Sequence, residues 1–84
     1  MRLFDALDRD TARRYGPKVK AAPMANVDYK VRFQKWSASR TMKPPPSCGR
    51  IFAGYLVVRQ LGTAGQYETW IPGEAFDEIY TPAP

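Results

Sequence analysis

The sequence predicts a small α+β fold: an antiparallel sheet of about three strands with an N-terminal helix and a short C-terminal helix. Two observations lead to this prediction. The apolar periodicity changes from helical spacing to strict alternation along the chain, and a glycine-bearing turn joins two strand-like segments further on. A chain of 84 residues buries a little over about 60% of its surface on folding, which allows one thin core. We therefore expect a single domain over residues 1–84.

Residues 2–15 are expected to form the N-terminal helix. Apolar and aromatic side chains recur there at spacings of three and four, which places them on one stripe: Leu3, Phe4, Leu7, Thr11 and Tyr15. Acidic residues lie early, and Arg13 and Arg14 lie late, as the helix dipole favours. Gly16 and Pro17 then end the helix, because glycine suits the left-handed cap and proline cannot continue the ladder.

The next segment, 17–25, holds two prolines and several small residues and is expected to be an extended connector. Residues 27–34 then alternate strictly between apolar and polar side chains, which is typical of a half-buried strand. The apolar set is Val27, Tyr29, Val31 and Phe33, and the polar set is Asp28, Lys30, Arg32 and Gln34. Trp36 falls outside the alternation, so we expect a bulge or the strand end near Lys35.

Residues 37–49 are expected to be a proline-rich loop, because the three prolines at 44–46 have no backbone donor and favour polyproline II. The loop also carries Arg40 and Lys43. A loop of this length in so small a domain is commonly functional or mobile. Two interpretations therefore stay open: a disordered connector and a binding segment.

The C-terminal third is expected to be a hairpin and a short helix. Residues 51–71 contain a strand that is apolar on both faces, a glycine-bearing turn and a returning strand. Pro72 and Gly73 end the hairpin, and residues 73–80 then place Phe76 and Tyr80 on one helical face. The last four residues are expected to be a frayed tail.

The distribution of charge is uneven. The net charge is +5, yet residues 13–50 hold ten basic residues against Asp28 alone, and the C-terminal segment is acidic. A positive middle attracts phosphates, anionic ligands or an acidic protein surface. The alternative interpretation is that the surplus serves solubility alone.

Several classes of chemistry are excluded by composition. The chain has no His and one Cys, which excludes a Ser-His-Asp triad, a His-ligated metal, a zinc finger and an internal disulfide. Cys48 lacks a partner base and is expected to be a spectator thiol. The carboxylates of Glu74, Asp77 and Glu78 are expected to lie on a solvated helix face. We expect no catalytic residue, no metal and no cofactor.

Localisation is expected to be cytoplasmic. No apolar run approaches the ~18 residues of a membrane span, and acidic residues interrupt the N-terminus where a secretory signal would be apolar. A small sheet has exposed edges, so pairing of two copies along an edge strand is also expected as one form of assembly.

Binding is the function class that remains. The expected partner-binding residues lie on the polar face of the alternating segment, at its end and in the loop: Lys30, Arg32, Lys35, Trp36, Arg40 and Lys43. Basic residues beside an aromatic one fit a phosphate backbone and a stacked base, and they equally fit an acidic protein surface. Trp36 has a further interpretation, as a large side chain that covers one edge of the core.

The segments 54–58, 67–72 and 74–80 together resemble the C-terminal half of small phage and prophage proteins related to the PGDYG-type family. These proteins have a glycine-led strand, a turn, a returning strand, a proline and a Phe-x-x-x-Tyr helical turn. This chain departs from them in having Tyr55 where they carry an acidic residue. The resemblance implies a fold and a phage source, and it carries no catalytic residue.

Two functions follow as hypotheses. The first is a non-catalytic phage accessory protein that binds and occludes a host protein or complex in the bacterial cytoplasm, such as an anti-CRISPR inhibitor of a defence system. The second is a nucleic-acid or nucleotide-binding module that uses the same basic residues. We favour the first because the resemblance implies a phage source and because no recognised nucleic-acid motif is present.

Overall fold

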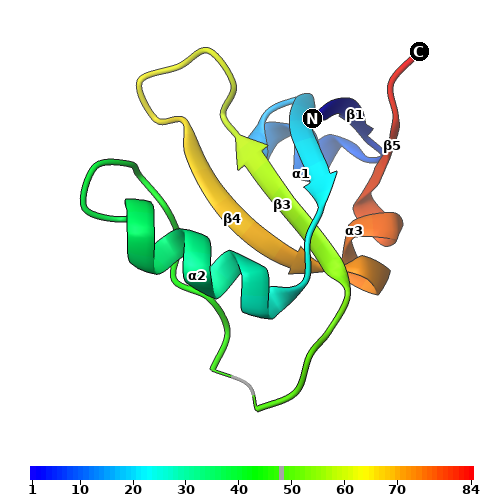
Figure 1. Ribbon diagram of the computed structural model, residues 1–84. Coiled ribbons are helices and arrows are strands. Elements are labelled where there is room, and N and C mark those ends of the chain that lie inside the picture. Colours follow the sequence, from blue (N-terminus) through cyan, green and yellow to red (C-terminus); the bar gives the residue numbers. More distant parts are fainter. Residues whose placement is uncertain (48) are drawn as a thin grey trace.

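A five-stranded antiparallel sheet organises the chain, with three short helices around it (Figure 1). The computed structural model describes residues 1–47 and 49–84. The elements follow in this order: β1 (Arg2–Ala6), α1 (Arg9–Tyr15), β2 (Lys18–Pro23), α2 (Asn26–Trp36), β3 (Gly54–Arg59), β4 (Tyr67–Pro72), α3 (Gly73–Ile79) and β5 (Tyr80–Pro82). The expected α+β class with an antiparallel sheet is confirmed, but the sheet has five strands where about three were expected.

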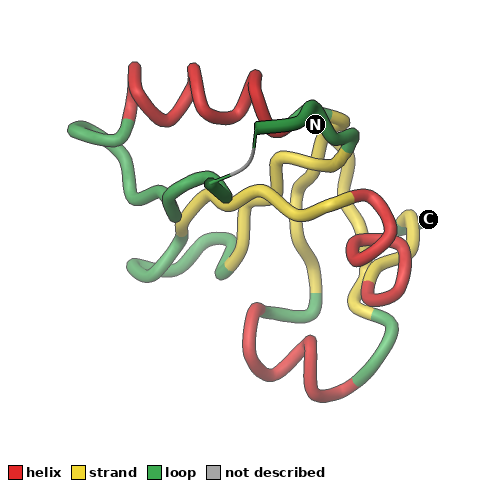
Figure 2. Tube along the Cα trace, turned by 90° about the horizontal axis from the view of Figure 1, so that it is seen from below, coloured by secondary structure: helices red, strands yellow, loops and turns green. Residues whose placement is uncertain are grey.

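The strand order is β4-β3-β2-β1-β5, and each neighbouring pair is antiparallel. The first four strands therefore form a meander. The chain then crosses through α3, and β5 pairs beside the first strand with Tyr80 opposite Ala6, as in a Greek-key return. Figure 2 shows the helices lying apart from one another around this sheet. The arrangement leaves β4 and β5 as the two edges.

One face of the sheet carries the main core beneath α3. Its buried members come from all five strands and the helix: Phe4, Val19, Ala21, Val57, Ile71, Phe76 and Tyr80. Aromatic rings fill the centre of this cluster. The rings of Tyr55 and Phe76 stack with centroids 4.0 Å apart, and Phe4 meets Phe76 edge-to-face at 4.9 Å. Such pairs add specific geometry to ordinary apolar burial.

The opposite face is covered by α2, which packs against β4. Buried Leu56 and Val58 of β3 point to this side, and the fully buried Tyr29 is the main α2 side chain there. On α2 the buried or half-buried positions recur every three or four residues: Asn26, Tyr29, Arg32, Phe33 and Trp36. That spacing is the helical one.

The expectation of a strand over residues 27–34 was therefore wrong. Tyr29 and Phe33 are four residues apart, so they fit both an alternating strand and a helical stripe. The residues that separate the two patterns are Val27 and Val31, which are exposed on the helix rather than buried. The helix begins at buried Asn26, which donates through Nδ2 to the Arg50 carbonyl at 2.8 Å. Because Asn26 is polar, a search for apolar spacing does not count it as a buried position, and the helical pattern is missed.

The expected helix over residues 2–15 was also wrong in its first half. Residues 2–6 form β1, and the helix begins only after Asp8. The Asp8 carboxylate accepts a hydrogen bond of 2.7 Å from the Thr11 backbone N–H and another of 3.1 Å from its hydroxyl. This is an N-cap, and these hydrogen bonds lower the pKa of Asp8. The capping residue, rather than the apolar spacing, decides where the helix starts.

Two more strands lie where none was expected. The segment 17–25, expected to be a connector, contains β2, and β5 begins at the last residue of the expected short helix and continues into the expected tail. The last residue of each of these strands is a proline. The missing backbone N–H costs little at a strand end, so the prolines do not prevent pairing. The structure places β3 within the expected hairpin, β4 one residue beyond its expected end, at Pro72, and α3 within 73–80. The described part of loop 37–49 holds no helix or named strand, and Cys48 lies outside the described residues.

Candidate functional site

All six expected partner-binding residues lie on α2 and in the loop that follows it, but not on one strand face. On a strand, residues 30 and 32 would share a face. On a helix they lie about 200° apart, and the structure separates them accordingly. Lys30 is exposed, whereas Arg32 is half-buried and turned toward β4.

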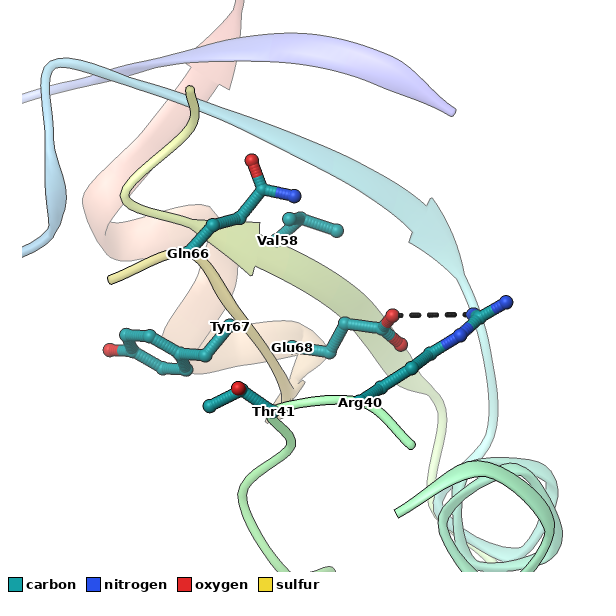
Figure 3. Close-up of a pocket in the computed structure, with 6 residues that line it drawn as sticks. All are labelled: Arg40, Thr41, Val58, Gln66, Tyr67 and Glu68. Carbon is teal, nitrogen blue, oxygen red and sulfur yellow. Dashed lines mark hydrogen bonds and ion pairs between the residues drawn. The ribbon is translucent and has the colours of Figure 1, made fainter. Parts of the chain in front are cut away.

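Glu68 of β4 is the partner that the sequence did not reveal. Its Oε1 lies 2.8 Å from Arg32 Nε, and its Oε2 lies 3.5 Å from Arg40 Nη1. Figure 3 shows the Glu68 carboxylate and the Arg40 guanidinium pointing toward each other. The Glu68 side chain is only 13% exposed. Both oxygens of one carboxylate therefore hold α2 and its loop against the sheet. Arg32 and Arg40 thus have a structural role within the fold.

Trp36 lies half-buried at the end of α2, between two cations. The Arg40 guanidinium carbon is 4.6 Å from the ring centroid, and Lys35 Nζ is 5.2 Å from it. Both are cation–π distances. A nucleic-acid base that stacked on this ring would compete with these contacts. Trp36 is half-buried and is not one of the buried core residues.

The loop after α2 lies along the edge of β4. Glu68 donates its backbone N–H to the Thr41 carbonyl at 2.9 Å, and its carbonyl accepts from the Lys43 N–H at 2.8 Å. Met42 forms a parallel bridge with Glu68. Lys43 Nζ lies 5.5 Å from the Tyr67 ring centroid. The backbone edge that an expected strand-paired dimer would use is thus partly covered by the chain itself.

A hollow of about 360 Å³ lies beside Glu68 (Figure 3). It is lined by Arg40, Thr41, Val58, Gln66, Tyr67 and Glu68. The carboxylate is already held by two guanidinium groups, and neither Thr41 nor Tyr67 has a base beside it in the hollow. Within the described part of the chain, no three His, Cys, Asp or Glu side chains gather as a metal site would require.

The exposed side of α2 is the most distinctive surface of this region. We define the α2 face as Val27, Lys30, Val31 and Lys35, all of them exposed. Val27 and Val31 are four residues apart and form an apolar ridge, with Val31 63% exposed. Across residues 1–47 and 49–84, neither Lys30 nor Lys35 takes part in an ion pair. The valines were assigned to the core by the alternating pattern, so sequence reasoning missed them as contact residues.

No protein-family model, no curated protein and no solved structure matches this chain. In the chain as described, no helix has the length and apolar character needed to cross a membrane.

Proposed function

We propose that this chain is a non-catalytic binding protein that docks its α2 face on an acidic surface of a larger protein and occludes it. The observation that carries the proposal is the pairing of an exposed apolar ridge, Val27 and Val31, with Lys30 and Lys35 on the same side of the helix. An isolated surface valine needs no explanation, but two on one ridge beside lysines form a small interface of mixed character.

The two kinds of side chain have different roles in this proposal. Association can bury only the part of each valine that the fold leaves exposed, 38% of Val27 and 63% of Val31, so each contributes less than the roughly 1.5 kcal/mol of a fully exposed valine. The lysines contribute mainly to the rate of encounter and to the choice of an acidic partner. Because Glu68 holds Arg32 and Arg40, the helix is fixed on the sheet before it meets the partner, which lowers the cost of ordering.

A nucleic-acid partner is the less favoured alternative. Arg32 and Arg40 are engaged by Glu68, and the Trp36 ring lies between two cations. Two of the expected phosphate contacts, Arg32 and Arg40, and the ring expected to stack on a base are therefore engaged by the protein itself. The resemblance to phage accessory proteins supplies the biological setting of the proposal, in which a phage-encoded inhibitor binds a host protein or complex in the bacterial cytoplasm.

The test is capture of a partner from bacterial lysate on the immobilised chain, before and after nuclease treatment, followed by mass spectrometry. The double variant Lys30→Glu, Lys35→Glu is expected to lose a stoichiometric partner that the unmodified chain retains. The matched control is Arg13→Glu, Lys20→Glu, which changes the net charge equally at exposed positions of α1 and β2. The control is expected to retain the partner.

Three outcomes contradict the proposal. They are the absence of any stoichiometric partner, loss of the partner on nuclease treatment, and equal loss in the two double variants. A bound nucleic acid would reveal itself through a steep fall in affinity with rising salt, because phosphate contacts release counterions.

A further inference from the structure

A second surface, beyond the start of α2, forms an apolar groove with a volume of about 570 Å³. It lies where the end of the long loop meets the junction of β4 and α3. Its walls are mostly aromatic and proline side chains: Pro46, Phe52, Trp70 and Pro72, with Glu74 at the α3 end. The proposed function does not use this groove.

The aromatic wall on β4 is fixed in place. The Trp70 indole donates its Nε1–H to the Met24 carbonyl at 2.7 Å. A Cβ placed on Gly54 would collide with the Trp70 ring and with the Ile71 carbonyl oxygen. The indole therefore lies against the bare backbone of β3, and glycine is required there because any side chain would displace the ring.

The opposite wall is held by α2. The Phe52 backbone N–H donates to Asn26 Oδ1 at 2.7 Å, and its carbonyl accepts from the Asn26 N–H at 3.0 Å. Asn26 is buried, yet the Phe52 side chain remains 46% exposed. A large apolar side chain is thus presented to solvent by a rigid anchor. Such preorganised aromatic side chains are the usual anchors of an interface.

The charges around the groove select its occupant. An adjoining hollow shares Pro46 with the groove and is lined by Lys30. Arg50 lies just before the Phe52 wall and is exposed, whereas Glu74 lies at the far end. The loop end is therefore positive. A second copy of the chain, with a net charge of +5, is repelled from this end.

We propose that this groove binds an acidic segment of the partner protein by taking one large apolar side chain between Phe52 and Trp70, with carboxylates of the segment directed toward Lys30 and Arg50. The inference rests on the proposed function in that it gives the same partner a second point of attachment. Together the α2 face and the groove would place the partner across the start of α2.

The test uses short synthetic peptides of three kinds, titrated into the ¹⁵N-labelled protein. One has a central Phe flanked by Asp and Glu, one has the same Phe flanked by Lys, and one is acidic with Ser in place of Phe. The chain has two tryptophans, and their indole N–H signals report separately on the groove (Trp70) and on the end of α2 (Trp36). The acidic Phe peptide is expected to shift the Trp70 indole signal saturably, and the other two are not.

A pair of adjacent variants tests the groove itself. Phe52→Glu is expected to weaken binding of the acidic Phe peptide by at least about tenfold. Ile51→Glu makes the same change of charge at a residue that is 74% exposed and outside the groove lining, and it is expected to weaken binding much less, through the added charge near Arg50 alone. The dispersion of amide signals verifies that both variants fold.

The proposal is overturned if the Trp70 signal is unmoved at high peptide concentration, if the Lys-flanked peptide binds equally well, or if the two variants weaken binding equally. The two proposals fail separately. A captured lysate partner with no peptide binding at Trp70 overturns the groove alone. Peptide binding at Trp70 with no captured partner overturns the proposed function of the α2 face alone.

Discussion

The hydroxyl group of Tyr29 donates a hydrogen bond of 2.5 Å to the carbonyl oxygen of Lys43. The donor lies on α2, and the acceptor lies in the loop strip that pairs with Glu68 on the edge of β4. The Glu68 carbonyl lies 3.4 Å from the same hydroxyl. Tyr29 is fully buried. One phenol group thus joins the helix, the loop and the sheet edge.

Removal of this hydroxyl is expected to destabilise the fold. Tyr29→Phe keeps the ring but leaves the Lys43 carbonyl without its side-chain donor, which costs about 1–2 kcal/mol in the free energy of unfolding. Urea denaturation measures the change. The control is Tyr67→Phe, because the Tyr67 hydroxyl makes no hydrogen bond to the described residues. A loss as large in Tyr67→Phe as in Tyr29→Phe would contradict the prediction.

Alkaline pH is expected to weaken the fold through the same residue. Burial raises the pKa of Tyr29 from 10.0 to about 12, and the nearby Glu68 charge acts in the same direction. The neutral phenol is therefore favoured in the folded state. Its contribution is fully present below pH 10 and is lost as the pH rises toward 12.

The measurement is the urea midpoint of the unmodified chain and of Tyr29→Phe between neutral pH and pH 12, over the range set by the raised pKa. The decline with pH should be shallower in Tyr29→Phe. Some decline should persist, because burial also raises the pKa of Tyr80. Parallel curves for the two proteins would show that Tyr29 does not titrate in this way.

Glu68→Gln is expected to loosen α2 and the loop together. The substitution removes the charge that both Arg32 and Arg40 face, while the size of the side chain is kept. Hydrogen bonds to charged groups contribute about 1.5–3 kcal/mol each in favourable sites, so a loss of about 2 kcal/mol is expected for this partly buried cluster. Urea denaturation of Glu68→Gln beside Glu78→Gln, an exposed α3 position, isolates the effect. Equal stability of the two variants would argue against it.

Gly54→Ala is expected to destabilise the fold by overpacking. The added methyl group would overlap the Trp70 ring and the Ile71 carbonyl oxygen, and such overlaps cost about 1–3 kcal/mol. The displaced indole should also change the Trp70 fluorescence. Gly65→Ala is the control, because its nearest neighbour would be at an ordinary 3.7 Å. An unchanged Trp70 signal in Gly54→Ala would show that the ring does not rest on this glycine.

The Asp8 cap is expected to give acid-dependent stability. Its pKa is lowered from 3.8 mainly by the hydrogen bond from the Thr11 backbone N–H. The stabilisation is therefore present above the unfolded value and is lost as the pH falls through the lower folded value. Asp8→Ala should lower the melting temperature at neutral pH and have little effect near pH 2. A decrease of the same size at both pH values would exclude the ionised cap as its cause.

The parts of the fold that the sequence predicted are those with local signals. The β3–β4 hairpin and α3 are adjacent along the chain, and glycine and proline mark their ends. The strands that were missed pair with distant partners, as Ala6 does with Tyr80. Such pairing depends on tertiary contacts that a short window of sequence does not contain.

The arrangement of the six candidate residues could not be predicted from the sequence. Their separation depends on a helix that the alternation concealed. The role of Arg32 depends on Glu68, which is 36 residues away in the chain. No spacing within residues 27–43 indicates that contact. The ridge of Val27 and Val31 became visible as a surface only once the helix was known.

The pairing of Thr41 and Lys43 with Glu68 has a consequence for the behaviour of the protein in concentrated solution. An uncovered edge strand is a template on which other chains can add and aggregate. Here the loop covers part of the β4 edge. The loop is held there by the Tyr29 hydroxyl and the Glu68 carboxylate rather than by a long series of backbone hydrogen bonds. Resistance to fibril growth at the β4 edge therefore depends on a few side-chain contacts rather than on continuous strand pairing.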